Sequence, residues 1–454
     1  MPVPSNANFN TENAKRAKRP VYLFEIAGYT RKFISHDMSQ PNQYPWTVEV
    51  EPLRQSASDL RGTSELSDLT VRVIDKDNLV TADFPSLVFE GRVATLKIGF
   101  DAIAQGDFIT RFTGEVDRVE SADRNTVWSF VCKPKLRGTK EVIFTTGDDG
   151  KPTSADHPRT VEGNPIEIIR EVWLTELGLS AGEIDGIVLD AYENQLFSAF
   201  KLRFALTSAP EAKAFLDKEI FQPLGGYAFA RADGKLSVKF FWPTAGSVVS
   251  QLTLTDQNLI TLPTLEQSDL INVVTHRFDY DGSELRSENV EIFTASETKY
   301  GQQGRHVVDS RGMRSNLQGF SLARLVARSV FNRYGDKNAR VDVELFWDAC
   351  LLEIGDFVRL THPLVPDRET GTVGVTAHLF EVLNGTLNFR KGTVRLSLVD
   401  ASDVELASAS FFKWAPDGTP DFAAASQAQR DAYMFVADDA TGDYSTGADG
   451  HRLA

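Results

Sequence analysis

The residues that come nearest to a nucleotide-binding motif are Gly147-Asp148-Asp149-Gly150-Lys151. A phosphate-binding loop of the Walker type needs a further glycine five positions before the Gly of its Gly-Lys pair, and a Ser or Thr after the lysine. Here the first of these positions holds Thr145, and Pro152 follows the lysine. Because glycine, aspartate and proline are common in turns, we interpret the segment as a surface turn.

Two acidic stretches offer the oxygen ligands that Ca²⁺ prefers, but neither has the required spacing. Asp75-Lys76-Asp77 continues with Asn78, Leu79 and Val80, where a calcium loop needs a further ligand and a glycine. Asp279-Tyr280-Asp281-Gly282 has its glycine too early, and this pattern favours a hairpin turn.

Histidine–carboxylate pairs close in sequence are His276 with Asp279 and His306 with Asp309. A metal site needs three or four converging ligands, so we interpret both histidines as structural or solvated. The sequence contains no His-Glu-x-x-His, Cys-x-x-Cys or Gly-x-Ser-x-Gly motif. We therefore predict no catalytic residue, no metal and no cofactor, and expect that the protein is not an enzyme.

Two other kinds of chemistry stay open at this stage. The separation of a glycosidase's two carboxylates is a property of the fold, so a cell-wall hydrolase remains an alternative. Exposed aromatic side chains bind sugars, and Trp46, Trp414 and Tyr444 would be the candidates in a carbohydrate-binding or adhesin module.

Composition limits the partners. The chain has 454 residues, enough for roughly three or four domains, and its 42% hydrophobic content suffices for packed cores. The formal net charge of −15 repels nucleic acid unless a basic patch is segregated on one face. No apolar run reaches the ~20 residues of a membrane span, and the N-terminus lacks an apolar signal core.

Cys132 and Cys350 are the two cysteines, and both stand in apolar strand-like contexts. A free thiol there behaves as a small hydrophobe. We expect folding in a reducing compartment, the cytoplasm.

The clearest succession of strands lies between Ala339 and Ala401. Val341, Val343 and Leu345 alternate with polar residues, and Leu352–Leu360 is a strand broken at a Gly-Asp pair. About five short strands with tight turns predict a small antiparallel barrel or sandwich.

The remaining pattern predicts the other domains. The expected division is a polar N-terminal arm at 1–20, a first β-barrel at 21–144, a small α+β domain at 145–255, a second β-barrel at 256–401 with a helix at about 320–334, and an acidic extension at 402–454. The arm, with its cluster of Lys and Arg, is expected to be solvated or to dock on a neighbour. Residues 293–319 lack periodicity and predict a long loop.

Helix signals define the α+β domain. A helix at about 164–177 begins with Asn164 as N-cap and Pro165 in the first turn, and Gly178 ends it. A second, at about 208–222, opens with a capping box over Ser208–Glu211. A hairpin at 227–240 turns at Asp233-Gly234.

The order of these segments resembles the baseplate hub, or tail-tip hub, proteins of tailed bacteriophages with long non-contractile tails and of related gene transfer particles. The segments that carry the resemblance are Phe112-Thr113-Gly114-Glu115-Val116, Gly225-Gly226-Tyr227, Asp233-Gly234-Lys235-Leu236, Ile271-Asn272-Val273-Val274, Arg333-Tyr334-Gly335 and Leu352-Glu353-Ile354-Gly355-Asp356-Phe357-Val358.

The resemblance implies a mainly β, multi-domain fold with an α+β insert and two tail-tube-like β-sandwich or barrel domains, each with a flanking helix or insert. Three such chains would present six domains as a pseudo-sixfold ring on a hexameric tail tube. Some relatives carry an iron–sulfur segment, which two cysteines cannot supply. The sequence shows no repeat between the two expected barrels.

The leading hypothesis is a structural virion protein: a homotrimeric hub at the tail tip, assembled in the host bacterial cytoplasm. It would join a distal tail or tube protein ring above to tip or fibre proteins below and form part of the DNA channel, with no membrane segment. DNA would pass without specific binding, and part of the −15 charge is expected to face the channel and repel it.

Overall fold

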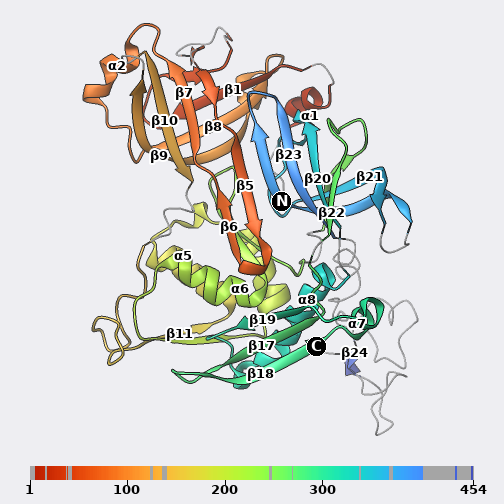
Figure 1. Ribbon diagram of the computed structural model, residues 1–454. Helices are drawn as coiled ribbons and strands as arrows, with labels where there is room; N and C mark the ends of the chain where they lie inside the picture. The colour runs from red at the N-terminus through yellow and green to blue at the C-terminus, as the bar shows by residue number, and fades with distance from the viewer. Residues whose placement is uncertain are drawn as a thin grey trace.

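A computed structural model gives the fold. It describes residues 6–15, 18–36, 38, 43–45, 47–122, 126–134, 141–244, 248–267, 269–336, 339–367, 372–401, 435–436 and 451–452. The described part is mainly β, in several separate sheets with an α+β insert, as the sequence predicts. In Figure 1 two large sheets lie side by side above, and the insert and a smaller sheet lie below.

The first sheet has eight strands, with β3 and β4 at its edges. In spatial order these are β3 (Gln43–Tyr44), β2 (Lys32–Ile34), β1 (Pro20–Ile26), β8 (Val93–Phe100), β9 (Ile109–Ala122), β10 (Val127–Pro134), β7 (Leu69–Ile74) and β4 (Thr47–Val50). The short helix α2 (Leu79–Asp83) joins β7 to β8. The core of this first sheet holds the packed rings of Phe24, Phe33, Phe89 and Phe130. The ring centroids of the contacting pairs are 5.5–6.4 Å apart.

The second sheet is built mainly from the region after residue 339. In spatial order its strands are β15 (Ser250–Leu254), β21 (Phe357–Pro366), β22 (Val373–Asn388), β23 (Thr393–Asp400), β20 (Ala339–Phe346) and β16 (Thr264–Gln267). The succession of strands predicted over 339–401 is therefore present. The structure differs from the expected boundary at 256, because β15 lies before it and pairs in parallel with β21.

A two-stranded ribbon, β5 (Leu53–Ser58) and β6 (Thr63–Leu66), leaves the first sheet although it lies within the expected first barrel. β5 pairs with β22 of the second sheet, with Leu53 opposite Leu387. Figure 1 shows the ribbon running down between the two sheets. Alternation identifies a strand but not its partner, so the structure corrects the expectation of a self-contained barrel over 21–144.

The insert, residues 141–244, contains two small antiparallel strand pairs, four short α-helices and a 3-10 turn at Ala181–Glu183. The pairs are β11 (Arg159–Gly163) with β12 (Leu202–Leu206) and β13 (Gly226–Ala230) with β14 (Leu236–Phe240). The helices are α3 (Pro165–Arg170), α4 (Gly186–Tyr192), α5 (Ala212–Phe215) and α6 (Gln222–Leu224). All but α6 continue into a wider π-helical turn: Glu171–Glu176, Glu193–Phe197 and Leu216–Phe221.

The helix signals of the insert have different outcomes. The predicted start of α3 is confirmed: Asn164 accepts from the Ile166 N–H, and Glu167 completes a capping box. The predicted capping box of the second helix is wrong, because the helix begins at Ala212 and its N-cap Glu211 makes no side-chain cap bond. The helix α4 was not predicted from the sequence.

A third sheet lies apart from the second, which the expected single barrel over 256–401 did not anticipate. Its strands are β18 (Leu285–Ile292), β17 (Val273–Tyr280) and β19 (Arg305–Asp309), with β17 in the centre. The helix α8 (Gly319–Tyr334) packs on it through Phe278 and Phe320, whose ring centroids are 4.9 Å apart. The long loop predicted at 293–319 is wrong, since α7 (Thr294–Tyr300) and β19 lie within it.

The described part of the N-terminal arm is not a solvated segment. It forms α1 (Ala7–Asn13), whose fully buried Phe9 packs on Phe100, 5.0 Å between ring centroids. Lys18 forms an ion pair with Asp348, before the second sheet's β21. Asn6 and Asn13 also donate to the carbonyls of Asp107 and Asp348, over 2.9 and 3.1 Å, so a buried ring and side-chain hydrogen bonds dock the segment together. Of the acidic extension, the structure describes only β24 (Phe435–Val436) paired with β25 (His451–Arg452).

Both cysteines are free and buried, as predicted. Burial raises the pKa of each thiol to about 12, which keeps the thiol neutral. Among the described helices none has the length and apolar character to cross a membrane.

An aromatic cluster joins the first sheet to the second. Tyr22 of β1 meets Trp347 and Phe389 edge to face, with ring centroids 5.9 and 5.2 Å away. Its hydroxyl donates to the Phe389 carbonyl over 2.9 Å. Burial raises the pKa of this phenol, so it remains a donor at neutral pH.

We expect Tyr22→Phe to lower the free energy of unfolding by about 1 kcal/mol or more, because the buried Phe389 carbonyl loses its donor. Tyr280→Phe is the matched control: its exposed hydroxyl also donates to a backbone carbonyl, that of Gly282, over 2.7 Å. Water can replace that bond. Urea unfolding of both variants checks the difference, and equal losses would contradict it.

Candidate functional site

The predicted turn at Gly147–Lys151 is confirmed. The Gly147 N–H donates to the Lys151 carbonyl over 2.7 Å, and the Gly150 N–H donates to the Gly147 carbonyl over 3.0 Å. The side chain of Asp148 accepts from the Thr160 N–H. The N–H groups of Asp148 and Lys151 also donate, to the Pro158 carbonyl and the Asp149 side chain, so these backbone groups are not free to hold a phosphate.

The acidic stretches serve local structure. Asp75 accepts hydrogen bonds from the backbone N–H groups of Val80 and Thr81, at the start of α2. Asp281 accepts from the N–H groups of Ser283 and Glu284, which lowers its pKa and closes the β17–β18 hairpin. The interpretation of 279–282 as a hairpin turn is confirmed.

His276 and His306 were interpreted as structural or solvated, and no hydrogen bond or ion pair joins them to Asp279 or Asp309 in the described part of the chain. His276 of β17 is buried, and burial lowers its pKa to about 4, so it is neutral at physiological pH. Burial also lowers the pKa of His306. Asp309 binds Arg277 through two bonds of 2.7 and 2.8 Å, and Asp279 accepts from the Ser315 N–H.

Within the described residues, no three His, Cys, Asp or Glu side chains are grouped so as to hold a metal ion. Trp46, Trp414 and Tyr444, the candidates for sugar binding, lie outside the described residues. Between the sheets lies a set of buried charges that form two ion pairs.

Glu353 lies where the first sheet, the insert and the second sheet meet. The Nη1 of Arg111, on β9, is 3.1 Å from the Glu353 Oε1, and its Nη2 donates to the Leu352 carbonyl over 2.7 Å. The N–H of Ala232, in the β13–β14 turn, donates to the same carboxylate oxygen over 2.8 Å. Thr113 of β9 donates to the Ala232 carbonyl over 3.0 Å. We call these five residues the Glu353 junction.

The loop that carries Glu353 is fixed by its own sequence. Gly355 has a φ of +84°, a conformation that L side chains rarely adopt. The first part of the predicted strand over Leu352–Leu360 is wrong, because residues 352–356 form a turn and β21 begins only at Phe357. Asp356 accepts from the Glu353 N–H over 2.9 Å. The Lys239 Nζ donates to the Gly355 carbonyl over 3.0 Å and lies 4.4 Å from the Phe357 ring centroid.

The charges of the junction depend on each other. Arg111 and Glu353 are each only 2% exposed. Burial raises the pKa of Glu353 above its usual range, and the Arg111 guanidinium opposes that shift. Burial also raises the pKa of Asp356. Since water reaches neither partner, losing one would leave the other charged group buried and uncompensated.

A second buried ion pair joins α8 to the second sheet. Arg333 binds Glu381 of β22, and both side chains are almost fully buried. The Arg333 guanidinium also lies over the Phe241 ring, 4.6 Å from its centroid. Gly335 comes directly after the last residue of α8. Any other residue there would place its Cβ 2.6 Å from the Phe331 carbonyl oxygen, which is too close. It does not end the helix through a left-handed conformation, as glycine often does.

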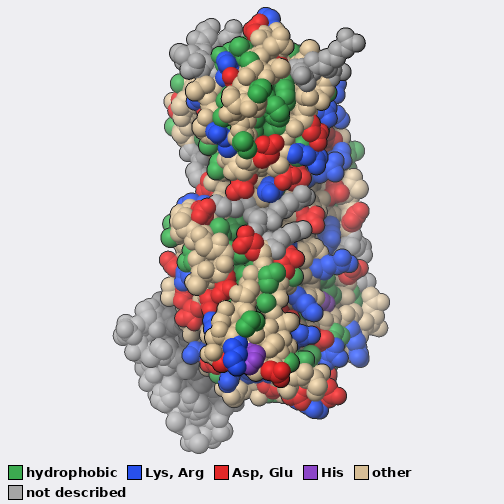
Figure 2. All heavy atoms as spheres, turned by 90° about the vertical axis from the view of Figure 1, so that its left-hand side faces the viewer, with side chains coloured by type: hydrophobic (Ala, Val, Ile, Leu, Met, Phe, Trp, Pro, Cys, Tyr) green, Lys and Arg blue, Asp and Glu red, His purple; other side chains and the backbone are tan. Residues whose placement is uncertain are grey.

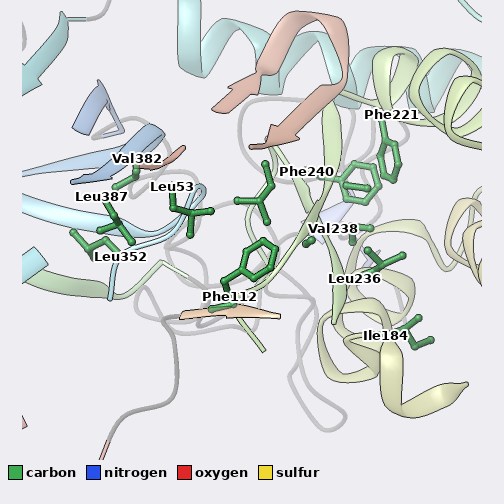
Figure 3. Close-up of a cluster of buried hydrophobic side chains, with 14 of the residues drawn as sticks. Leu53, Phe112, Ile184, Phe221, Leu236, Val238, Phe240, Leu352, Val382 and Leu387 are labelled. Carbon is green, nitrogen blue, oxygen red and sulfur yellow. The ribbon is translucent and has the colours of Figure 1, made fainter. Parts of the chain in front are cut away.

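Hydrophobic side chains surround the junction. In Figure 3, Phe112 of β9 lies between Leu352 and Leu387 of the second-sheet region and Leu236 and Val238 of the insert. The core is thus continuous across three parts of the chain. A cavity of about 340 Å³ lies beside it, with Lys239 and Asp356 in its wall. Burial lowers the pKa of Lys239.

The segment with Glu353 is among those that carry the resemblance, but the sequence does not identify Arg111 as its partner. The local pattern gave no signal for it: Phe112 and Gly114 alternate as the buried face, which places Arg111 on the opposite face, yet Arg111 and Phe112 are both buried because the β8–β9 register shifts between Thr110 and Phe112. Charged residues are rarely fully buried unless paired. The partner itself could not be identified, because 242 positions separate the two residues.

We expect Arg111→Met to lower the free energy of unfolding by about 3–5 kcal/mol, because it leaves the Glu353 carboxylate buried without its cation. The double variant Arg111→Met/Glu353→Met should be markedly more stable than the single one. Urea unfolding of both checks this. The single variant Glu353→Met completes the cycle: if the loss in the double variant equals the sum of the two single losses, the two charges are not coupled.

No protein-family model matches the chain, and no curated protein does. Solved structures with a similar arrangement include the 43 kDa tail protein of prophage MuSo2 from Shewanella oneidensis (TM-score 0.46, 11% identity, 85% of this chain and 99% of that one). A tail protein from Neisseria meningitidis has a TM-score of 0.44 at 10% identity, over 85% and 99% of the two chains. A prophage tail protein from Listeria monocytogenes has a TM-score of 0.48 at 9% identity, over 83% and 94%.

Proposed function

We propose that this chain is a structural tail protein of a phage-type particle: a homotrimeric hub that joins a tail-tube ring above to tip or fibre proteins below. It would be assembled in the host bacterial cytoplasm and reside in the virion. In this role the protein works through its interfaces and carries no catalytic residue.

One observation carries the proposal. Segments that resemble the hub family lie far apart in the sequence, yet they meet around the two buried ion pairs. Thr113 of the first segment bonds Ala232 beside the hairpin turn, Glu353 binds both Ala232 and Arg111, and Arg333 binds Glu381. The shared pattern therefore maintains a rigid connection between sheets, which is what a load-transmitting protein needs.

The division into two large sheets supports the proposed ring. Three chains with two eight-stranded sheets each would supply six units around a tube. The edge strands carry unpaired backbone groups, and ring closure would cover them. At the edge strand β16, Leu265 is 42% exposed and the nearby Leu262 is 72% exposed, so this edge has apolar surface to bury.

Charge supports a channel through which DNA passes without specific binding. The chain carries −15 overall, and on the face seen in Figure 2 acidic and basic side chains are interspersed. We propose that part of the acidic surface faces the channel. A cryo-EM map of the assembled trimer tests this, and a channel wall that is basic along its whole length would contradict it.

The trimer is tested by the mass of the intact oligomer. Light scattering and native mass spectrometry should give three times the 50.3 kDa chain mass. Leu265→Glu should weaken this assembly, because it places a charge on the exposed edge, whereas Ile187→Glu, at an exposed position of the insert, should not. A monomer at every concentration would contradict the proposal.

Clearing of a cell-wall zymogram, lost with one Glu→Gln change, would favour a hydrolase instead.

A further inference from the structure

A hollow of about 390 Å³ lies on the face of the second sheet that points away from its core. Opposite residues of neighbouring strands share a face of a sheet. The registers place Arg54 of β5 opposite Thr386 of β22, Thr386 opposite Arg395 of β23, and Arg395 opposite Glu344 of β20. These four residues form one row across the sheet and line the hollow.

Cations outnumber anions in this hollow. Arg54, Lys391 and Arg395 line it, with Glu344 as the one carboxylate among its lining residues. Arg395 is 70% exposed and lies 3.5 Å from Glu344. Within the described part of the chain, the side chains of Arg54 and Lys391 make neither an ion pair nor a hydrogen bond. The local excess of positive charge stands on a chain of net charge −15.

The other lining side chains are small and neutral. Thr386, Asn388 and Thr393 offer hydroxyl and amide groups, and the same face continues to Asn384 and Ser56. Such groups, together with Arg and Lys, make the contacts that proteins use for phosphate oxygens and sugars of a nucleic acid backbone. Acidic residues bound this positive region on two sides. Glu65 and Asp68 line the adjoining hollow of about 900 Å³, and Asp342 lies on β20, opposite Ser397 of β23.

We propose that this hollow, which we call the Arg54 hollow, binds the phosphodiester backbone of DNA. Three cations on a flat polar face neutralise phosphates but do not read base edges, so the contact is independent of sequence. An acidic chain meets nucleic acid only where basic residues are segregated, and the Arg54 hollow is such a place. Sequence-independent contacts of this kind are compatible with the proposed passage of DNA without specific binding, and they can be tested on the isolated chain whether or not it forms a hub.

Fluorescence anisotropy with the full chain and a duplex of about 20 base pairs, in two unrelated sequences, tests the proposal over about 25–200 mM salt. Each phosphate contact contributes about 0.9 to the slope of log affinity against log salt. We expect both duplexes to bind equally, and Arg54→Gln/Arg395→Gln to weaken binding roughly tenfold at the lowest salt and to reduce the slope by about 1.8.

The matched control is Arg118→Gln/Arg286→Gln, which removes the same charge from exposed positions of β9 and β18. It should leave affinity and slope nearly unchanged. Urea unfolding must show that both double variants are folded. The proposal is overturned if the control weakens binding as much, if no binding occurs at the lowest salt, or if polyglutamate displaces the duplex and depends equally on Arg54 and Arg395. That last result would assign the Arg54 hollow to an acidic polypeptide.

Discussion

The buried carboxylate of Glu353 is the constraint on which the rest of the structure depends. A charge taken out of water must be matched by a cation and by hydrogen-bond donors. Glu353 obtains the cation from β9 and a hydrogen-bond donor from the insert. If either β9 or the insert shifted, the buried Glu353 carboxylate would lose a partner. Hydrophobic contacts around Phe112 have no such directional requirement. The ion pair thus fixes the orientation of the sheets, and the core supplies the greater part of the burial.

Strand exchange reinforces this connection. The β5–β6 ribbon is continuous in sequence with the first sheet but pairs with β22 of the second. Lys18 and Tyr22, at the start of the first sheet, reach Asp348 and Phe389 on the other side. Three separate parts of the N-terminal region are therefore bound to the C-terminal one. A protein that transmits force between a tube and a tip would need its domains joined in this way.

The sequence predicted most of the strands and the start of α3, because alternation and capping are local properties. It predicted neither the transfer of β5 to the second sheet nor the separation of the third sheet, since the partner of a strand is decided by tertiary packing. The pattern around Glu353 indicates only a strand broken at a Gly-Asp pair, and nothing local marks Arg111, which lies at a register shift on the face opposite to the alternating Phe112 and Gly114. The charge of the N-terminal segment predicts an arm that is solvated or docks on a neighbour, whereas its described part docks on the chain itself through Phe9 and the side chains of Asn6 and Asn13.

The central claim is that the two large sheets and the insert form one mechanical unit held at the Glu353 junction. Hydrogen-exchange mass spectrometry of the native protein tests it most directly. If the claim is correct, the slowest amides of β9, of the β13–β14 hairpin and of β22 should exchange with the same free energy of opening and the same dependence on denaturant. If the first sheet opens at low denaturant while the second stays protected, the sheets are independent domains and the claim is contradicted.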